Sequence, residues 1–146
     1  MDPGVGEANP LFLYTDGASR GNPGPSAWAY ILVDEHRTVI EERARTIGRR
    51  TNNEAEYHGL IEGLRAAVRC GCTSLTVFSD SELVIRQMNG TYRVASPRLL
   101  PLYQEAQAAA KKCAGIQYRS VPRDHPVIAK ADRLCNEVLD QEGFPG

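Results

Sequence analysis

Four acidic residues stand at places where the sequence pattern changes from one predicted element to the next. Asp16 and Asp80 each follow a short apolar stretch, and Glu56 and Asp132 come early in two amphipathic stretches. The chemistry of open α/β sheets collects beyond the carboxyl ends of strands, so these acids are expected to meet at one sheet edge. Without an adjacent basic partner they would repel one another unless a cation neutralised them. Ligands that are all oxygen favour a hard cation, Mg²⁺ or Mn²⁺.

Three of these acids have an ordinary structural explanation when each is taken alone. Asp16 could cap a turn, Asp80 could cap a helix, and Asp132 could pair with a neighbouring base in solvent. Glu56 has no such explanation, because it lies four residues before a leucine on the apolar side of its predicted helix. An acid directed inward is unusual unless something pairs with it.

Two further acids are predicted to cap helices. Thr51-x-x-Glu54 and Ser79-x-x-Glu82 both have the form of a capping box, in which the hydroxyl and the carboxylate satisfy free donors at a helix start. Glu54 and Glu82 are therefore set apart from the four acids above.

The hydrophobic pattern predicts an α/β fold with elements in the order βββαβααβα. Strands are expected over residues 11–15, 27–33, 38–47, 75–78 and 116–121, and helices over 55–68, 82–88, 97–113 and 129–139. Short loops join the first three strands, which favours an antiparallel meander. The later strand–helix–strand connections favour parallel strands. We therefore expect a mixed sheet with helices on its faces.

The length and composition suit one soluble domain. The chain has 146 residues and a net charge of −1, so bulk charge alone gives no support for a nucleic-acid partner. No apolar stretch is long enough for a membrane helix, and the N-terminus lacks the features of a signal peptide, so we expect a cytoplasmic protein. The four cysteines are expected to be thiols in or near the core. We expect tails at residues 1–9 and 143–146 and a domain over 10–142.

Four motifs in this sequence resemble, in order and approximate spacing, those of type 1 ribonucleases H. They are Thr15-Asp16-Gly17-Ala18 with Gly21-Asn22-Pro23-Gly24, Thr51-Asn52-Asn53 with Ala55-Glu56-Tyr57, Ser79-Asp80-Ser81, and Lys130-Ala131-Asp132-Arg133-Leu134. The resemblance implies a ribonuclease H fold with a five-stranded mixed sheet. It also implies an endonuclease that cuts the RNA strand of RNA/DNA hybrids, leaving 5′-phosphate and 3′-hydroxyl ends. The implied cofactors are two Mg²⁺ ions roughly 3.5–4 Å apart, one activating water and one stabilising the leaving oxygen, with Mn²⁺ as a substitute.

The resemblance also implies roles for individual residues. The implied catalytic and metal-binding carboxylates are Asp16, Glu56, Asp80 and Asp132, with Gly17 as a further metal-site residue. The implied substrate-binding residues are Ser19, Asn22, Thr51, Asn52, Asn53 and Glu82, the last standing where relatives often carry Gln. Amide side chains suit a hybrid minor groove with its 2′-hydroxyls, although helix capping is an alternative role for Asn52 and Asn53.

The sequence departs from the family pattern in two places. Many members carry a basic, tryptophan-rich helix and loop after the third motif, whereas residues 89–98 here are short, so we expect the compact form and weaker hybrid binding. His125, seven residues before Asp132, is the candidate for the mobile histidine of the family. Asp124-His125-Pro126 also has the form of a helix entrance.

The expected partner is an RNA/DNA hybrid, with no membrane and no obligate protein partner, and the protein is expected to be a monomer. Another nuclease activity on the same fold is one alternative, since fold alone does not fix the substrate. A non-catalytic hybrid-binding module is a second, although all four acids are present. A magnesium-dependent phosphatase is disfavoured, because no glycine-rich phosphate loop precedes a lysine.

Overall fold

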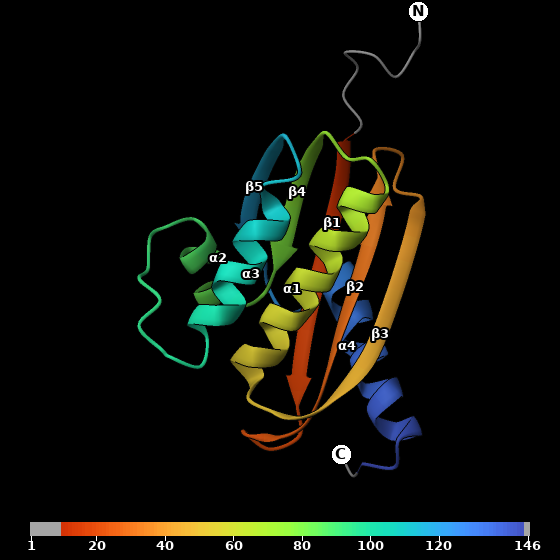
Figure 1. Cartoon of the computed structure of the whole chain (residues 1–146). Coiled ribbons are helices and arrows are strands. Elements are labelled where there is room, and N and C mark those ends of the chain that lie inside the picture. Colours follow the sequence, from red (N-terminus) through yellow and green to blue (C-terminus); the bar gives the residue numbers. More distant parts are fainter. Residues whose placement is uncertain (1–9, 145–146) are drawn as a thin grey trace, which may run out of the picture.

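A computed structural model describes residues 10–144 as five strands and four helices in the predicted order (Figure 1). The strands are β1 (Pro10–Ser19), β2 (Gly24–Asp34), β3 (Val39–Arg50), β4 (Ser74–Ser79) and β5 (Gly115–Ser120). The helices are α1 (Asn52–Arg69), α2 (Glu82–Met88), α3 (Leu100–Ala110) and α4 (Pro126–Gln141). The tail expected at residues 1–9, and the last two residues of the expected C-terminal tail, lie outside the described residues.

The strands form one mixed sheet in the order β3-β2-β1-β4-β5, as predicted. β1, β2 and β3 pair antiparallel, and β4 and β5 add to β1 as parallel strands. β1 is therefore central, with an antiparallel neighbour on one side and a parallel neighbour on the other. No helix in residues 10–144 combines the length and apolar character needed to cross a membrane.

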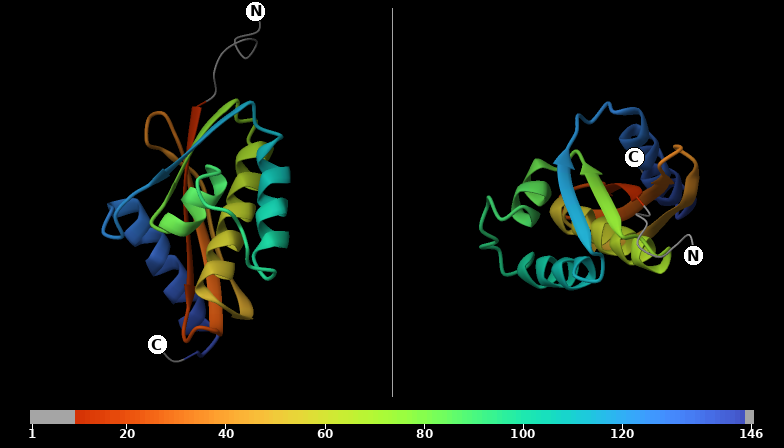
Figure 2. Two further views of the ribbon diagram at one scale, coloured as in Figure 1. Left: turned by 90° about the vertical axis from the view of Figure 1, so that its left-hand side faces the viewer. Right: turned by 90° about the horizontal axis from the view of Figure 1, so that it is seen from above.

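Helices cover the two faces of the sheet unequally (Figure 2). On one face, α1 packs on β1 and β2, and α3 packs against α1. Their apolar side chains share one core with alternate strand residues, including Leu13, Tyr30 and Val77. On the other face, α4 packs on the small and branched side chains of β2, such as Ala29 and Ile31. Because successive residues of a strand point to opposite faces, β2 supplies both cores and is buried nearly throughout.

β1 is longer than predicted, and this changes the place of Asp16. Its pairing with β4 stops at Tyr14, whereas its pairing with β2 continues to Ser19. Asp16 therefore lies inside a strand, beyond the end of β4, and not at a strand end as expected. The apolar pattern stops early because the last residues of β1 line a polar cleft on one side.

Two helix starts also differ from prediction. The expected capping box at Ser79 is wrong: β4 runs through Ser79, and Ser81 caps α2 by accepting from the Val84 N–H at 3.3 Å. The helix expected over residues 97–113 begins at Leu100, with a proline in its first turn. Residues 89–99, between α2 and α3, hold neither helix nor strand. The capping box of Thr51 and Glu54 at the start of α1 is confirmed.

Candidate functional site

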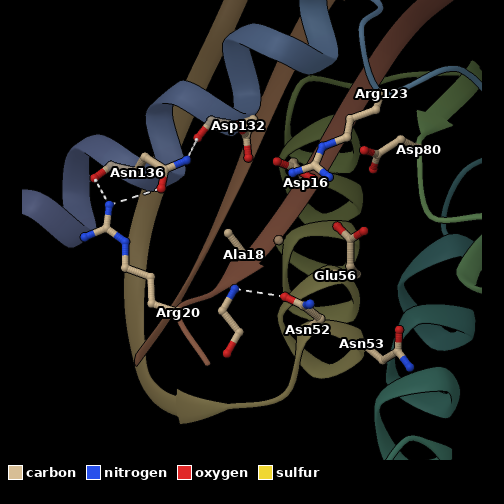
Figure 3. Close-up of a pocket in the computed structure, with 12 residues that line it drawn as sticks. Asp16, Ala18, Arg20, Asn52, Asn53, Glu56, Asp80, Arg123, Asp132 and Asn136 are labelled. Carbon is tan, nitrogen blue, oxygen red and sulfur yellow. Dashed lines mark hydrogen bonds between the residues drawn. The ribbon is translucent and has the colours of Figure 1, made fainter. Parts of the chain in front are cut away.

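The predicted acids line one cleft of about 440 Å³ at the carboxyl ends of β1 and β4 (Figure 3). Residues from β1, α1, the end of β4, the loop before α4 and α4 itself form its walls. They are Asp16, Gly17, Ala18, Ser19, Arg20, Asn52, Asn53, Glu56, Asp80, Arg123, Asp132 and Asn136. The prediction that four acids from distant motifs meet at one sheet edge is confirmed.

Three of the acids form a tight cluster. Asp16, Glu56 and Asp80 each offer a carboxylate oxygen, and these oxygens all lie within 4.8 Å of one another. Asp16 comes from β1, Glu56 from the first turns of α1, and Asp80 from the residue after β4. Figure 3 shows their side chains pointing toward one another. Asp132 lies on the α4 wall of the same cleft and is not part of this cluster.

Glycine residues allow α1 to approach β1 closely enough to form the cluster. A Cβ atom on Gly17 would lie 2.3 Å from the main chain of α1 at Ala55 and Glu56. A Cβ atom on Gly59 would lie 2.6 Å from the carbonyl oxygen of Asp16. Both distances are shorter than real Cβ contacts, so only glycine fits at these positions. The close packing sets Glu56 directly beside Asp16.

The cluster is electrostatically strained in the absence of a cation. Burial, followed by the charges of Asp80 and Asp132, raises the pKa of Asp16 to about 8. Burial and the charges of Asp16 and Asp80 raise the pKa of Glu56 well above its usual range. Burial also raises the pKa of Asp80. The Gly17 N–H lowers the pKa of both Asp16 and Glu56 but does not offset these effects.

The donor set fits a hard divalent cation. Oε1 of Glu56 is buried and has no hydrogen-bond partner among the described residues, although a buried polar atom is normally satisfied. It lies in a cluster of carboxylate oxygens whose negative charges repel one another. A cation such as Mg²⁺ or Mn²⁺ would satisfy the atom and neutralise the cluster, and oxygen-only ligands suit these ions.

A hydrogen-bond network holds the part of α4 that carries Asp132. Asn136 donates from Nδ2 to the Asp132 carbonyl oxygen at 3.0 Å. Arg20, in the turn after β1, donates to Oδ1 of Asn136 at 3.1 Å and pairs with Asp140 at 2.8 Å. Its guanidinium also donates to the Phe144 carbonyl. Arg20 thus fixes α4 against the β1–β2 turn. Its role was missed because it lies in a glycine-rich turn without periodicity.

Arg123 is a second residue that the sequence analysis missed. It lies in the loop between β5 and α4, lines the cleft, and lowers the pKa of Asp80 through its positive charge. Asp80 therefore has a basic residue nearby, which the sequence analysis did not identify. The rule that drew attention to Asp16 and Asp80 could have found it, because Arg123 follows the carboxyl end of β5 by three residues.

Polar groups near the cleft tie the β1–β2 turn to the start of α1. The Ser19 N–H donates to Oδ1 of Asn52 at 2.9 Å, and the Asn52 N–H donates to Oδ1 of Asn22 at 3.1 Å. Thr51 caps α1, so its hydroxyl has a structural role. Asn52 therefore bridges to β1 and does not cap the helix with its side chain. Asn53 is exposed and lines the cleft beside Asn52.

Four residues named in the sequence analysis lie outside the cleft lining: Asn22 and Thr51, described above, and His125 and Glu82. His125 caps α4: its Nδ1 accepts from the Val127 N–H at 3.2 Å, and its ring stacks on Tyr14 at 5.4 Å between centroids. This confirms the helix-entrance interpretation of Asp124-His125-Pro126. Glu82 pairs with Arg86 at 2.6 Å on the exposed side of α2.

Known proteins similar to this chain agree with the site. The family described as "Reverse transcriptase-like" matches residues 14–138. "Bifunctional protein Rv2228c" of Mycobacterium tuberculosis is 48% identical over 131 residues, which are 89% of this chain and 35% of that protein. This chain thus spans about a third of the length of that relative. "Ribonuclease H" of Bordetella pertussis is 36% identical over 151 residues, covering 94% of each chain.

Solved structures show the same architecture. The N-terminal RNase H domain of rv2228c from Mycobacterium tuberculosis, fused to maltose binding protein, is similar with a TM-score of 0.87 at 44% identity, over 92% of this chain and 96% of that chain. LC11-RNase H1 in complex with RNA/DNA hybrid is similar with a TM-score of 0.85 at 34% identity, over 90% of this chain and 98% of that chain. The sheet order and the acidic cleft thus define a ribonuclease H-like domain. The chain belongs to the ribonuclease H family, which confirms the resemblance found in its motifs.

Proposed function

We propose that this protein is a divalent-metal-dependent endonuclease that hydrolyses the RNA strand of RNA/DNA hybrids. The observation that carries the proposal is the cluster of Asp16, Glu56 and Asp80, with the buried, unpartnered Oε1 of Glu56. A purely structural cluster of acids would pay a large electrostatic cost without benefit. The ribonuclease H named from Bordetella pertussis and the hybrid complex of LC11-RNase H1 support the choice of substrate.

The carboxylates would hold the metal and control the charge of the cleft. With a pKa of about 8, Asp16 holds a proton at neutral pH when no cation is present and releases it when positive charge enters. The pKa of Glu56 is also raised, so this carboxyl too holds a proton more readily when no cation is present. Asp132 would complete the cleft from α4. Bound divalent ions supply activation of water and neutralisation of the phosphate charge.

The rim of the cleft would distinguish the RNA strand. Asn52 and Asn53 present amide groups where β1 meets α1, and Ser19 and Asn22 lie beside them. Neutral donors and acceptors of this kind can contact 2′-hydroxyls and base edges without reading sequence. Arg123 adds a positive charge on the opposite wall, suited to a backbone phosphate.

The proposal also covers the metal, the oligomeric state and the location of the enzyme. We propose that it uses two Mg²⁺ ions, which Mn²⁺ can replace. We also propose that it is a cytoplasmic monomer without an obligate protein partner. The metal choice rests on the oxygen-only donor set, and the other parts rest on the sequence.

Cleavage of end-labelled substrates tests the proposal. RNA in an RNA/DNA hybrid is compared with single-stranded RNA and both homoduplexes, in Mg²⁺ and in Mn²⁺. Asp80→Asn is expected to abolish cleavage, because it removes one charged ligand from the cluster. Asp124→Asn is the matched control: it makes the same chemical change at an exposed residue outside the cleft lining.

Cleavage confined to the RNA of the hybrid, lost in Asp80→Asn and kept in Asp124→Asn, supports the proposal. Cleavage of a homoduplex at a similar rate indicates a different nuclease on the same fold. A hybrid that is bound but stays intact in both metals indicates a binding module.

A further inference from the structure

Two cysteine thiols contact each other at the end of the sheet away from the acidic cleft. Cys72 lies between α1 and β4, Cys113 lies between α3 and β5, and their sulfur atoms are 2.8 Å apart. Figure 1 shows these connections where α1 and α3 end and β4 and β5 begin. The acidic cleft is lined by residues at the other ends of β1 and β4. The contact joins residues 41 positions apart in the sequence.

We propose that Cys72 and Cys113 form a site of reversible oxidation, at which a low-molecular-weight disulfide converts the two thiols into an internal disulfide. This site is separate from the proposed nuclease function and does not depend on it.

The backbone around the two thiols is already set for a cross-link. β4 and β5 pair with Ser74 opposite Gly115, so each cysteine stands two residues before the first pair of neighbouring parallel strands. A disulfide needs about 2.05 Å between sulfur atoms, so the two atoms must approach by less than about 1 Å. The strand pairing therefore supplies the alignment, and side-chain rotation closes the remaining gap.

The two thiols are equally buried, each residue being 7% exposed, but they differ in position. Cys113 lines a surface hollow together with Met88, Gln107 and Lys111, which is the side from which a small reagent would approach. Burial and the neighbouring Cys113 raise the pKa of Cys72 to about 12, so Cys72 stays protonated at neutral pH. Cys113 is thus the attacking thiol and Cys72 the resolving one.

The exchange is balanced in atoms and electrons. The Cys113 thiolate attacks one sulfur of the reagent RSSR, which forms a mixed disulfide and releases RS⁻. That thiolate takes the proton of Cys72, whose sulfur then attacks the Cys113 sulfur and releases the second RS⁻, which is protonated by solvent. The protein loses two electrons, and the reagent becomes two molecules of RSH.

The cross-link is expected to stabilise the domain and leave the cleft unchanged. It closes the segment that contains β4, α2 and α3, which restricts the unfolded chain. A loop of this length predicts a rise in the melting temperature of roughly 5–15 °C. Hybrid cleavage should change little, because the cleft lies at the opposite end of β4.

The test exposes the full chain to oxidised glutathione or to dithiothreitol, followed by peptide mapping without reduction and by thermal unfolding. We expect one linked peptide pair containing Cys72 and Cys113, a higher melting temperature, and reversal by dithiothreitol. Cys113→Ala should remove the oxidation-dependent shift. Cys135→Ala, in the other core, should keep it.

The comparison of oxidised and reduced protein is made within each variant, so a variant that is itself less stable still gives an answer. Glutathione attached to a single cysteine without an internal link, a link between two molecules, or a shift that persists in Cys113→Ala would each overturn the proposal. Thiols that remain reduced after prolonged exposure in the folded protein would also overturn it.

Discussion

Replacing Asp16 with asparagine is expected to stabilise the metal-free protein, and to stabilise it more as the pH rises. Burial and the neighbouring acids raise the pKa of Asp16 from 3.8 in the unfolded chain to about 8 in the folded protein. Between these values the folded state binds more protons than the unfolded state. Stability therefore falls as the pH rises through this window, which is opposite to the usual behaviour of a paired carboxylate. Asparagine has nearly the same shape and carries no charge.

The size of the effect follows from the two pKa values. Linkage gives a cost of roughly 2 kcal/mol at about pH 5 and roughly 4 kcal/mol at about pH 7, so the cost grows by about 2–3 kcal/mol between them. Asp16 is only 5% exposed, so solvent screens this cost little. For a chain of this length, the gap in melting temperature between variant and wild type should widen by roughly 5–10 °C.

Thermal or urea unfolding in a chelator, from about pH 5 to about pH 8, measures the gap between Asp16→Asn and the wild type. Glu137→Gln is the matched control, because Glu137 is an exposed acid on α4 outside the cleft lining. Adding Mg²⁺ near pH 8 should raise the melting temperature of the wild type and not that of Asp16→Asn.

Parallel stability curves for Asp16→Asn and the wild type across this pH range would refute the reasoning, because they would mean that Asp16 ionises in the folded protein without cost. A widening gap of similar size in Glu137→Gln would refute it as well, because the cause would then be the total charge and not the cleft.

Three further predictions concern packing, capping and charge. Gly59→Ala should lower hybrid cleavage at least tenfold and reduce the free energy of unfolding by about 1–3 kcal/mol, because the new Cβ meets the main chain of β1. Gly63→Ala is the control: its new Cβ meets the side chain of Leu13, which can move, so cleavage and stability should fall less. His125→Ala should lower the melting temperature by roughly 2–4 °C, because it removes the cap of α4, and should leave kcat for hybrid cleavage unchanged. A large fall in kcat at an unchanged melting temperature would contradict this. Arg123→Gln should shift the acid limb of the pH–rate profile upward, because the arginine lowers the pKa of Asp80; an unmoved limb would contradict it.

Much of the cleft could be predicted because each acid is tied to a local pattern. Glu56 was identified by its place on the apolar side of a helix, and Asp80 by the apolar strand before it. The fold order followed from the change of hydrophobic period between strands and helices, and the sheet order agrees with it.

The remaining features depend on contacts between distant segments. β1 continues past Asp16 because β2 still pairs with it, which no local pattern of β1 records. Arg20 and Arg123 lie in loops, where side chains are placed by the elements that they meet. His125 was ambiguous in sequence because a histidine before a proline can cap a helix or take part in catalysis, and its contacts show that it caps α4.

The attachment of α4 also determines when the cleft forms during protein synthesis. Arg20 and Asn136 are 116 positions apart, and α4 follows every other helix and strand of the described chain. The ribosome extends a chain at roughly 5–20 residues per second, so Asp16, Glu56 and Asp80 are translated well before Asp132. A nascent chain that lacks α4 therefore carries three of the four acids without the wall that the fourth provides. Under the proposed function, the protein becomes competent to cut nucleic acid only when its last helix docks on the turn that was made first.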